Sequence, residues 1–140
     1  MNKHPRPEIA MAFDFGSKET GVAVGQTITR TARGVATLQC KGGKPRWPEV
    51  YNLISTYEPS VLIVGLPLHM NGEESDMSAL AREFADKLTE RFSLPVLMQD
   101  ERLTTRAADS AIADARETGS AKTEHELAAC LIFEDWSAQR

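Results

Sequence analysis

The chain has 140 residues, of which 41% are hydrophobic, and a formal net charge of -4. This length suits one globular domain that buries about two thirds of the surface of its unfolded chain, so a stable core needs no disulfide. The two cysteines, Cys40 and Cys130, match no metal-site or redox spacing, and no signal peptide or membrane-spanning apolar run is present. These features exclude disulfide scaffolds and membrane-spanning proteins, and we expect a soluble cytoplasmic protein.

The charge is unevenly distributed along the chain. No acidic residue lies between Glu19 and Glu49. The basic residues of this stretch are Arg30, Arg33, Lys41, Lys44 and Arg46. Such a segment in an acidic protein is either a solvated face balanced by charges elsewhere or a surface that faces a polyanion.

The first part of the chain is typical of antiparallel strands. Residues 1–8 contain two prolines and several charges, which indicates a flexible leader before a single domain over 9–140. The predicted strands are 9–15, 21–26 and 32–39. Short polar links between them favour antiparallel pairing.

A loop and a helix are predicted next. The stretch "CKGGKPRW", residues 40–47, has a glycine pair and a proline, so we predict a loop without regular structure. Pro48 suits the first position of a helix. The apolar face of this helix is Val50, Leu53, Ile54 and Tyr57.

The second half predicts strands that alternate with helices. "SVLIVG", residues 60–65, is an almost unbroken apolar run, which is typical of a central strand covered on both faces. Apolar residues then recur at three and four positions from Met77 to Phe92, which predicts an amphipathic helix. A strand is predicted at 95–99 and a further helix from about Thr105.

The last predicted helix begins at "TEHELAACLIFEDW". Thr123 and Glu126 have the S/T-x-x-E spacing of a capping box, which places the start of this helix. The order of elements predicts an α/β fold with a five-stranded mixed sheet, the first three strands antiparallel, and helices packed on both faces.

Carboxylates end two of the predicted strands. Asp14 ends the first strand, and Asp100 with Glu101 ends the last one. If these strands are close in the sheet, their carboxylates meet at one edge, where sites of such sheets gather. Clustered carboxylates are natural ligands for Mg²⁺ or Mn²⁺, and a pair of such ions about 4 Å apart can promote phosphodiester hydrolysis.

Three segments carry a resemblance to a known family. "FDFGSKETGVAVG", "VGLPLHMNG" and "DERLTT" resemble the three signature blocks of the YqgF (RuvX) family, and the resemblance extends over nearly the whole chain after the leader. It implies a ribonuclease-H-like fold and a metal-dependent nuclease that processes the 5′ end of pre-16S ribosomal RNA. The similarity of the same family to RuvC implies a second activity, Holliday-junction resolution on branched DNA.

The resemblance also implies the site residues. Asp14 matches the first-strand aspartate and Glu101 the glutamate of the D-E-R block, whereas His125 stands where the family has a third carboxylate. Imidazole is a softer ligand than Mg²⁺ prefers and brings no negative charge. We therefore take Asp14, Glu101 and His125 as the candidate catalytic residues, with Glu124 or Glu126 as a substitute ligand and Glu124 preferred, since Glu126 belongs to the capping box.

Basic residues are candidates for holding the nucleic-acid backbone. Lys18 lies in the first turn and Arg102 follows Glu101, and each could hold a phosphate oxygen. From the basic segment, Arg30, Arg33 and Lys44 are the further candidates. Solvation is the alternative interpretation of all five.

Two other classes of function stay open. "DFGSKETG" is similar to the first phosphate loop of actin-like and sugar-kinase ATPases, but a chain of 140 residues has no room for the second half of such enzymes. A noncatalytic RNA- or ribosome-binding protein on a nuclease fold is the stronger alternative, because of His125. The sequence leaves a monomer or a weak homodimer open.

Overall fold

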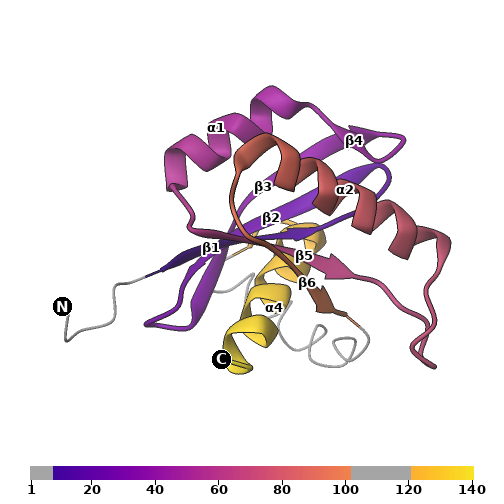
Figure 1. The fold of residues 1–140 in the computed structure, drawn as a ribbon. Coiled ribbons are helices and arrows are strands. Elements are labelled where there is room, and N and C mark those ends of the chain that lie inside the picture. Colours follow the sequence, from indigo (N-terminus) through magenta and orange to yellow (C-terminus); the bar gives the residue numbers. More distant parts are fainter. Residues whose placement is uncertain (1–7, 102–120) are drawn as a thin grey trace.

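The computed structural model describes residues 8–101 and 121–140, which form a curled sheet with helices on both faces (Figure 1). The strands are β1 (Ile9–Asp14), β2 (Glu19–Gln26), β3 (Thr31–Lys41), β4 (Lys44–Pro45), β5 (Val61–Leu66) and β6 (Val96–Asp100). The helices are α1 (Trp47–Tyr57), α2 (Asp76–Phe92) and α4 (Glu124–Ala138). None of these three helices is long and apolar enough to cross a membrane.

The strand order is β4-β3-β2-β1-β5-β6. Strands β1 to β4 pair antiparallel with their chain neighbours, whereas β5 lies parallel to both β1 and β6. The predicted mixed sheet with three antiparallel strands at its start is confirmed, and the predicted central strand is β5, which is buried along its whole length. The sheet has six strands and not five.

The additional strand lies in the segment predicted to be a loop. β3 continues to Lys41, and β4 pairs with its end. Cys40 lies opposite Pro45, and Lys41 lies opposite Lys44. The glycine pair, Gly42 and Gly43, has φ angles of +59° and +78°, and positive φ at both positions is what a tight two-residue hairpin turn requires. The loop prediction was wrong because these glycines reverse the strand instead of ending regular structure.

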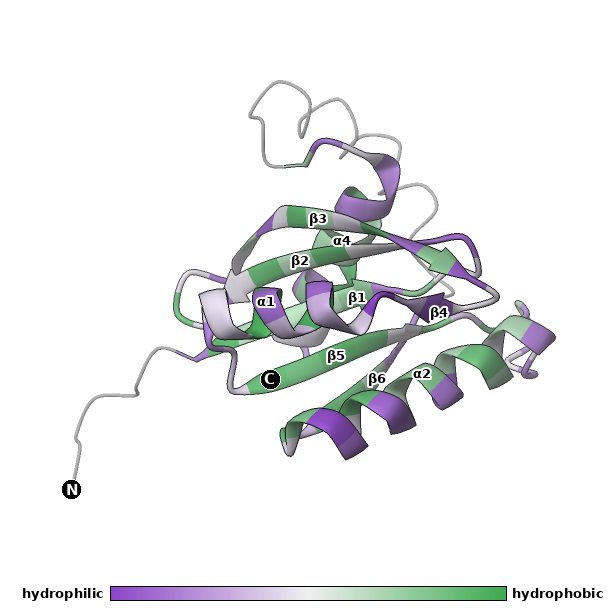
Figure 2. Cartoon of the chain, turned by 90° about the horizontal axis from the view of Figure 1, so that it is seen from above, coloured by the Kyte–Doolittle hydropathy of each residue, from purple (hydrophilic) through white to green (hydrophobic). Residues whose placement is uncertain are grey.

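Each face of the sheet has its own apolar core. Successive side chains of a strand point to opposite faces, so Met11 and Phe13 of β1 pack under α1 and α2, whereas Ala10 and Ala12 pack against α4. Figure 2, seen from the α1 and α2 side, shows apolar colour along the central strands. The small residues toward α4 let this helix lie close to the sheet.

The chain ends of the described part are tied together. The Glu8 backbone carbonyl accepts a hydrogen bond from the Thr27 amide, and the Glu8 carboxylate lies 2.9 Å from Nη1 of Arg140. Glu8, the last residue of the predicted leader, is therefore held against the domain. Residues 1–7, Arg102 and the helix predicted from about Thr105 lie outside the described residues.

Candidate active site

Three parallel strands bring the predicted carboxylates to one edge of the sheet. β1, β5 and β6 end at this edge, with Asp14 at the end of β1 and Glu101 directly after β6. β5 lies between them, and Gly65 near its end is the reason that they can meet. A β-carbon at position 65 would overlap the Glu101 carboxylate, so the glycine leaves the space in which Glu101 reaches across β5.

The side chains of Asp14 and Glu101 are hydrogen-bonded to each other. Burial, followed by the charge of Asp14, raises the pKa of Glu101 to about 8. Burial also raises the pKa of Asp14, while hydrogen bonds from Glu101 and His125 oppose this rise. Near neutral pH the pair therefore holds a shared proton, because two carboxylates in contact resist being charged together.

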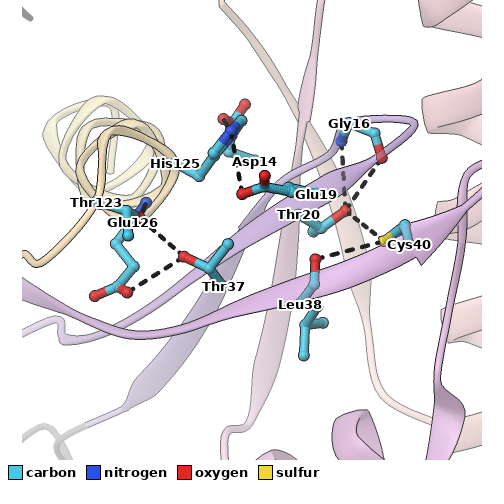
Figure 3. Close-up of polar contacts among 10 residues, drawn as sticks. All are labelled: Asp14, Gly16, Glu19, Thr20, Thr37, Leu38, Cys40, Thr123, His125 and Glu126. Carbon is cyan, nitrogen blue, oxygen red and sulfur yellow. Dashed lines mark hydrogen bonds and ion pairs between the residues drawn. The ribbon is translucent and has the colours of Figure 1, made fainter.

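His125 lies between two carboxylates, as Figure 3 shows. Its Nδ1 is 3.7 Å from Oδ2 of Asp14, and its Nε2 is 3.7 Å from Oε2 of Glu19, the first residue of β2. The His125 and Glu19 side chains are about half exposed, whereas 21% of the Asp14 side chain is exposed. The imidazole thus lies beside the Asp14 carboxylate and links it to a third acidic residue.

The close packing of α4 on β2 fixes this arrangement. A β-carbon at Gly21 would overlap the backbone carbonyl of His125, so the first turn of α4 lies directly on the strand. The helix begins after Thr123, whose hydroxyl accepts a hydrogen bond from the Glu126 amide. The position of His125 therefore depends on the absence of a side chain at residue 21.

Thr123 caps α4 as predicted, but the Glu126 side chain does not complete the capping box, so this half of the prediction was wrong. The Glu126 carboxylate accepts a hydrogen bond from the Thr37 hydroxyl on β3 (Figure 3). It also accepts one from the Lys122 amide, and the residue is 5% exposed. These contacts turn Glu126 toward β3 and away from Asp14. Glu124, the preferred substitute ligand, is the exposed first residue of α4 beside His125, and its role as a ligand stays a prediction.

The predicted cations lie at two ends of the sheet. Lys18 is exposed in the turn after β1, and its backbone carbonyl accepts a hydrogen bond from the Cys40 amide. Lys44 follows the β3–β4 turn at the same edge. Arg30 and Arg33 lie at the opposite end of the β2–β3 ladder, where Gln26 pairs with Thr31, and the Arg33 guanidinium lies 5.7 Å from the Tyr57 ring centroid.

Sequence reasoning missed three residues near this edge. Glu19 falls between two predicted strands, and only the pairing of β1 with β2 and the position of α4 show that it faces His125. Lys87 and Arg91 are on the polar face of α2, which the helical pattern does not distinguish from an ordinary solvated face. No spacing in the sequence indicates that these residues lie near Lys44.

Comparison with known proteins gives one family for the chain. The model of RuvX, described as Holliday junction resolvase, matches residues 8–139. A protein of Haemophilus ducreyi named "Putative pre-16S rRNA nuclease" is 43% identical over 90% of this chain and 93% of its own length. A protein of Pseudomonas putida with the same name is 44% identical over 91% of this chain and 93% of its own length.

Solved structures with the same fold are more distant in sequence. RuvC of T. thermophilus in complex with a Holliday junction substrate has a TM-score of 0.61, with 94% of this chain and 96% of that chain covered. The fowlpox virus resolvase with Holliday junction DNA has a TM-score of 0.51, with 91% and 97% covered. Both are 13% identical to this chain, so this likeness concerns the fold, a ribonuclease-H-like sheet.

Proposed function

The chain belongs to the RuvX family, a family of nucleases, and we propose that it is a divalent-metal-dependent nuclease that processes the 5′ end of pre-16S ribosomal RNA in the cytoplasm. The observation that carries the proposal is the Asp14 and Glu101 pair. Two carboxylates are held in contact at the carboxyl edge of the sheet, at the cost of a raised pKa for each. Such pairs are typical of sites that bind a cation or transfer a proton.

The residues present fit Mg²⁺ or Mn²⁺. These ions prefer carboxylate oxygens, and the charge of a bound cation would offset both the desolvation of Glu101 and its repulsion by Asp14. Asp14 and Glu101 would be the principal ligands, with His125, whose Nδ1 lies 3.7 Å from Asp14, and Glu124 as the further predicted ligands. When bound, the ion supplies Lewis-acid stabilisation of the charge that develops on the phosphodiester.

The remaining steps belong to the residues of the chain. Loss of the shared proton from Asp14 and Glu101 makes both carboxylates available to a cation, so the site is completed as this proton leaves. His125 limits the orientation of the Asp14 carboxylate through Nδ1. Lys18, exposed in the turn that follows Asp14, would neutralise a phosphate beside the scissile one.

Cleavage assays test the proposal. We expect a pre-16S rRNA fragment to be cut in the presence of Mn²⁺ or Mg²⁺, and no cleavage by Asp14→Asn. His125→Asp, which restores the family's carboxylate, is expected to raise the rate. The absence of cleavage by both the unmodified chain and His125→Asp, with folding retained, would overturn the proposal.

Two alternatives are outcomes of the same assay. Cutting of a four-way DNA junction in preference to RNA would favour a resolvase, which is the description of the matching family model. RNA binding without cleavage, combined with activity gained by His125→Asp, would indicate a binding protein on a nuclease fold. The observation that favours this second alternative is the imidazole in place of a third carboxylate.

A further inference from the structure

A cavity of about 210 Å³ lies between the β3–β4 hairpin and α2, and we call it the α2 groove. Its lining includes Phe15, Lys44, Trp47, Leu80, Lys87 and Arg91. We propose that the α2 groove binds one unpaired nucleotide of the substrate strand, beyond Lys18 on the path that leads away from the cleavage site at Asp14 and Glu101. This inference rests on the proposed function and adds the path and the single-stranded character of the substrate.

The groove and the active site lie on two sides of one turn. Asp14 and Phe15 are consecutive, so their side chains point to opposite faces, Asp14 toward α4 and Phe15 into the groove. The hairpin tip is fixed to this turn, because the Gly43 amide donates a hydrogen bond of 3.0 Å to the Ser17 carbonyl. A strand that leaves Asp14 across the exposed Lys18 therefore reaches the groove next.

The charge of the groove complements a phosphate backbone. Lys44, Lys87 and Arg91 contribute three positive charges, and among the described lining residues Glu83 is the one carboxylate. The Arg91 guanidinium lies 4.3 Å from the Trp47 ring centroid, which holds it in place before a ligand arrives. Lys87 lies 4.0 Å from Glu90, in an exposed contact that is weak enough to exchange for a phosphate.

The size and floor of the groove favour one nucleotide unit over a duplex. Pockets for drug-sized ligands have volumes of about 300–1,000 Å³, and this groove is smaller. Phe15 and Trp47 provide an apolar floor, with Phe84 packed between them. A sugar or base can be buried there only if it is unpaired, with its phosphates at the three cations.

Arg30 and Arg33, the other predicted contacts of the basic segment, offer a matched comparison. They lie at the other end of the β2–β3 ladder from Glu19, far from the α2 groove. A double change of Lys44→Gln and Lys87→Gln removes the same charge as a double change of Arg30→Gln and Arg33→Gln. The two double variants have equal net charge and thus compare two possible paths of the substrate strand over the protein.

The test is binding of a labelled single-stranded RNA to the full chain carrying Asp14→Asn, which prevents cleavage. We expect the Lys44 and Lys87 changes to weaken binding at least tenfold, and by a larger factor than the Arg30 and Arg33 changes. The slope of log K against log salt should become shallower by about 1.4, because each lost phosphate contact accounts for about 0.7 with single strands.

The outcomes separate this inference from the proposed function. Equal losses in the two double variants, or no loss in either, would overturn the groove as the binding site. Equal competition by a duplex of the same sequence would overturn the unpaired strand. If the unmodified chain cleaves nothing but RNA binding is lost when Lys44 and Lys87 are changed, the groove is supported and the nuclease is refuted. If the chain cleaves RNA but binding does not depend on these lysines, the nuclease is supported and the groove is refuted.

Discussion

The raised pKa of Glu101 makes the stability of the folded chain depend on pH. Burial and the neighbouring Asp14 raise its pKa from 4.5 to about 8, so the folded chain binds a proton that the unfolded chain has released between these pH values. The free energy of unfolding must therefore decrease as the pH rises through this range. The pair contributes its full stability only below the unfolded value, at about pH 4.5.

Replacement of Glu101 by Gln should remove this dependence. We expect Glu101→Gln to be more stable than the unmodified chain at pH 8 without metal, by at least roughly 1 kcal/mol, and to differ little near pH 5. Thermal unfolding at the two pH values measures this difference. Glu83→Gln, at an exposed carboxylate on α2, is the control and should keep the pH dependence of the unmodified chain.

Added Mn²⁺ provides a second readout of the same carboxylates. Since a divalent ion needs both carboxylates deprotonated, it should raise the melting temperature more at pH 8 than at pH 5.5. The increase should be absent in Asp14→Asn. An equal increase at both pH values, or one retained in Asp14→Asn, would show that the ion binds elsewhere.

Glu19 and His125 should act as one unit, because Nε2 of His125 lies 3.7 Å from the Glu19 carboxylate. Glu19→Gln alone should destabilise the chain by up to about 1 kcal/mol, the range of exposed ion pairs. In the His125→Asp background, the same change should stabilise, because Glu19 then faces a like charge. Urea unfolding of the four chains gives the coupling energy, and an equal effect of Glu19→Gln in both backgrounds would contradict a direct interaction.

At the scale of elements, the close packing of α4 on β2 decides where His125 lies. A β-carbon at Gly21 overlaps the His125 carbonyl, so Gly21→Ala should push the helix away, lower stability by roughly 1–3 kcal/mol and reduce cleavage. Gly42→Ala is the control, since nothing lies within 4 Å of its β-carbon and its φ of +59° costs about 1–2 kcal/mol in stability alone. Retained cleavage in Gly21→Ala would show that the site tolerates movement of α4.

The strands and helices of the core follow from local patterns that the sequence contains. β5 is a continuous apolar run, and α2 has apolar residues at three- and four-residue spacing, so burial and periodicity predict both. β4 has two residues, and its pairing depends on the glycine turn and on β3, which no periodicity reveals. Patterns therefore predict the elements that make the core and miss those that pairing creates.

The candidate site divides in the same way. Asp14 and Glu101 end strands, and both strands are evident in the sequence, so their meeting at one edge could be predicted. The neighbours of Glu19 depend on the register of β2, and those of Lys87 depend on the rotation of α2 about its axis. Both are set only in the folded structure. Their role could not be predicted from the residue types.

At the scale of the whole molecule, the distribution of exposed apolar side chains bears on the oligomeric state. The large exposed apolar residues of the described part are Ile28, Tyr51, Met70 and Leu97. They lie on four separate segments: the β2–β3 turn, α1, the loop after β5, and β6. Stable interfaces use contiguous apolar patches, so this scattering favours a monomer.

We expect sedimentation equilibrium at micromolar concentration to give the mass of one chain, 15.4 kDa. A monomer suits an enzyme that trims one RNA strand through a groove beside its site, because one active site makes one cut. A junction resolvase needs two sites related by a two-fold axis to cut paired strands symmetrically. A stable dimer without nucleic acid would contradict this expectation and shift the balance toward branched DNA, whereas a dimer that forms only on a four-way junction would show that the substrate, and not the protein surface, brings the two sites together.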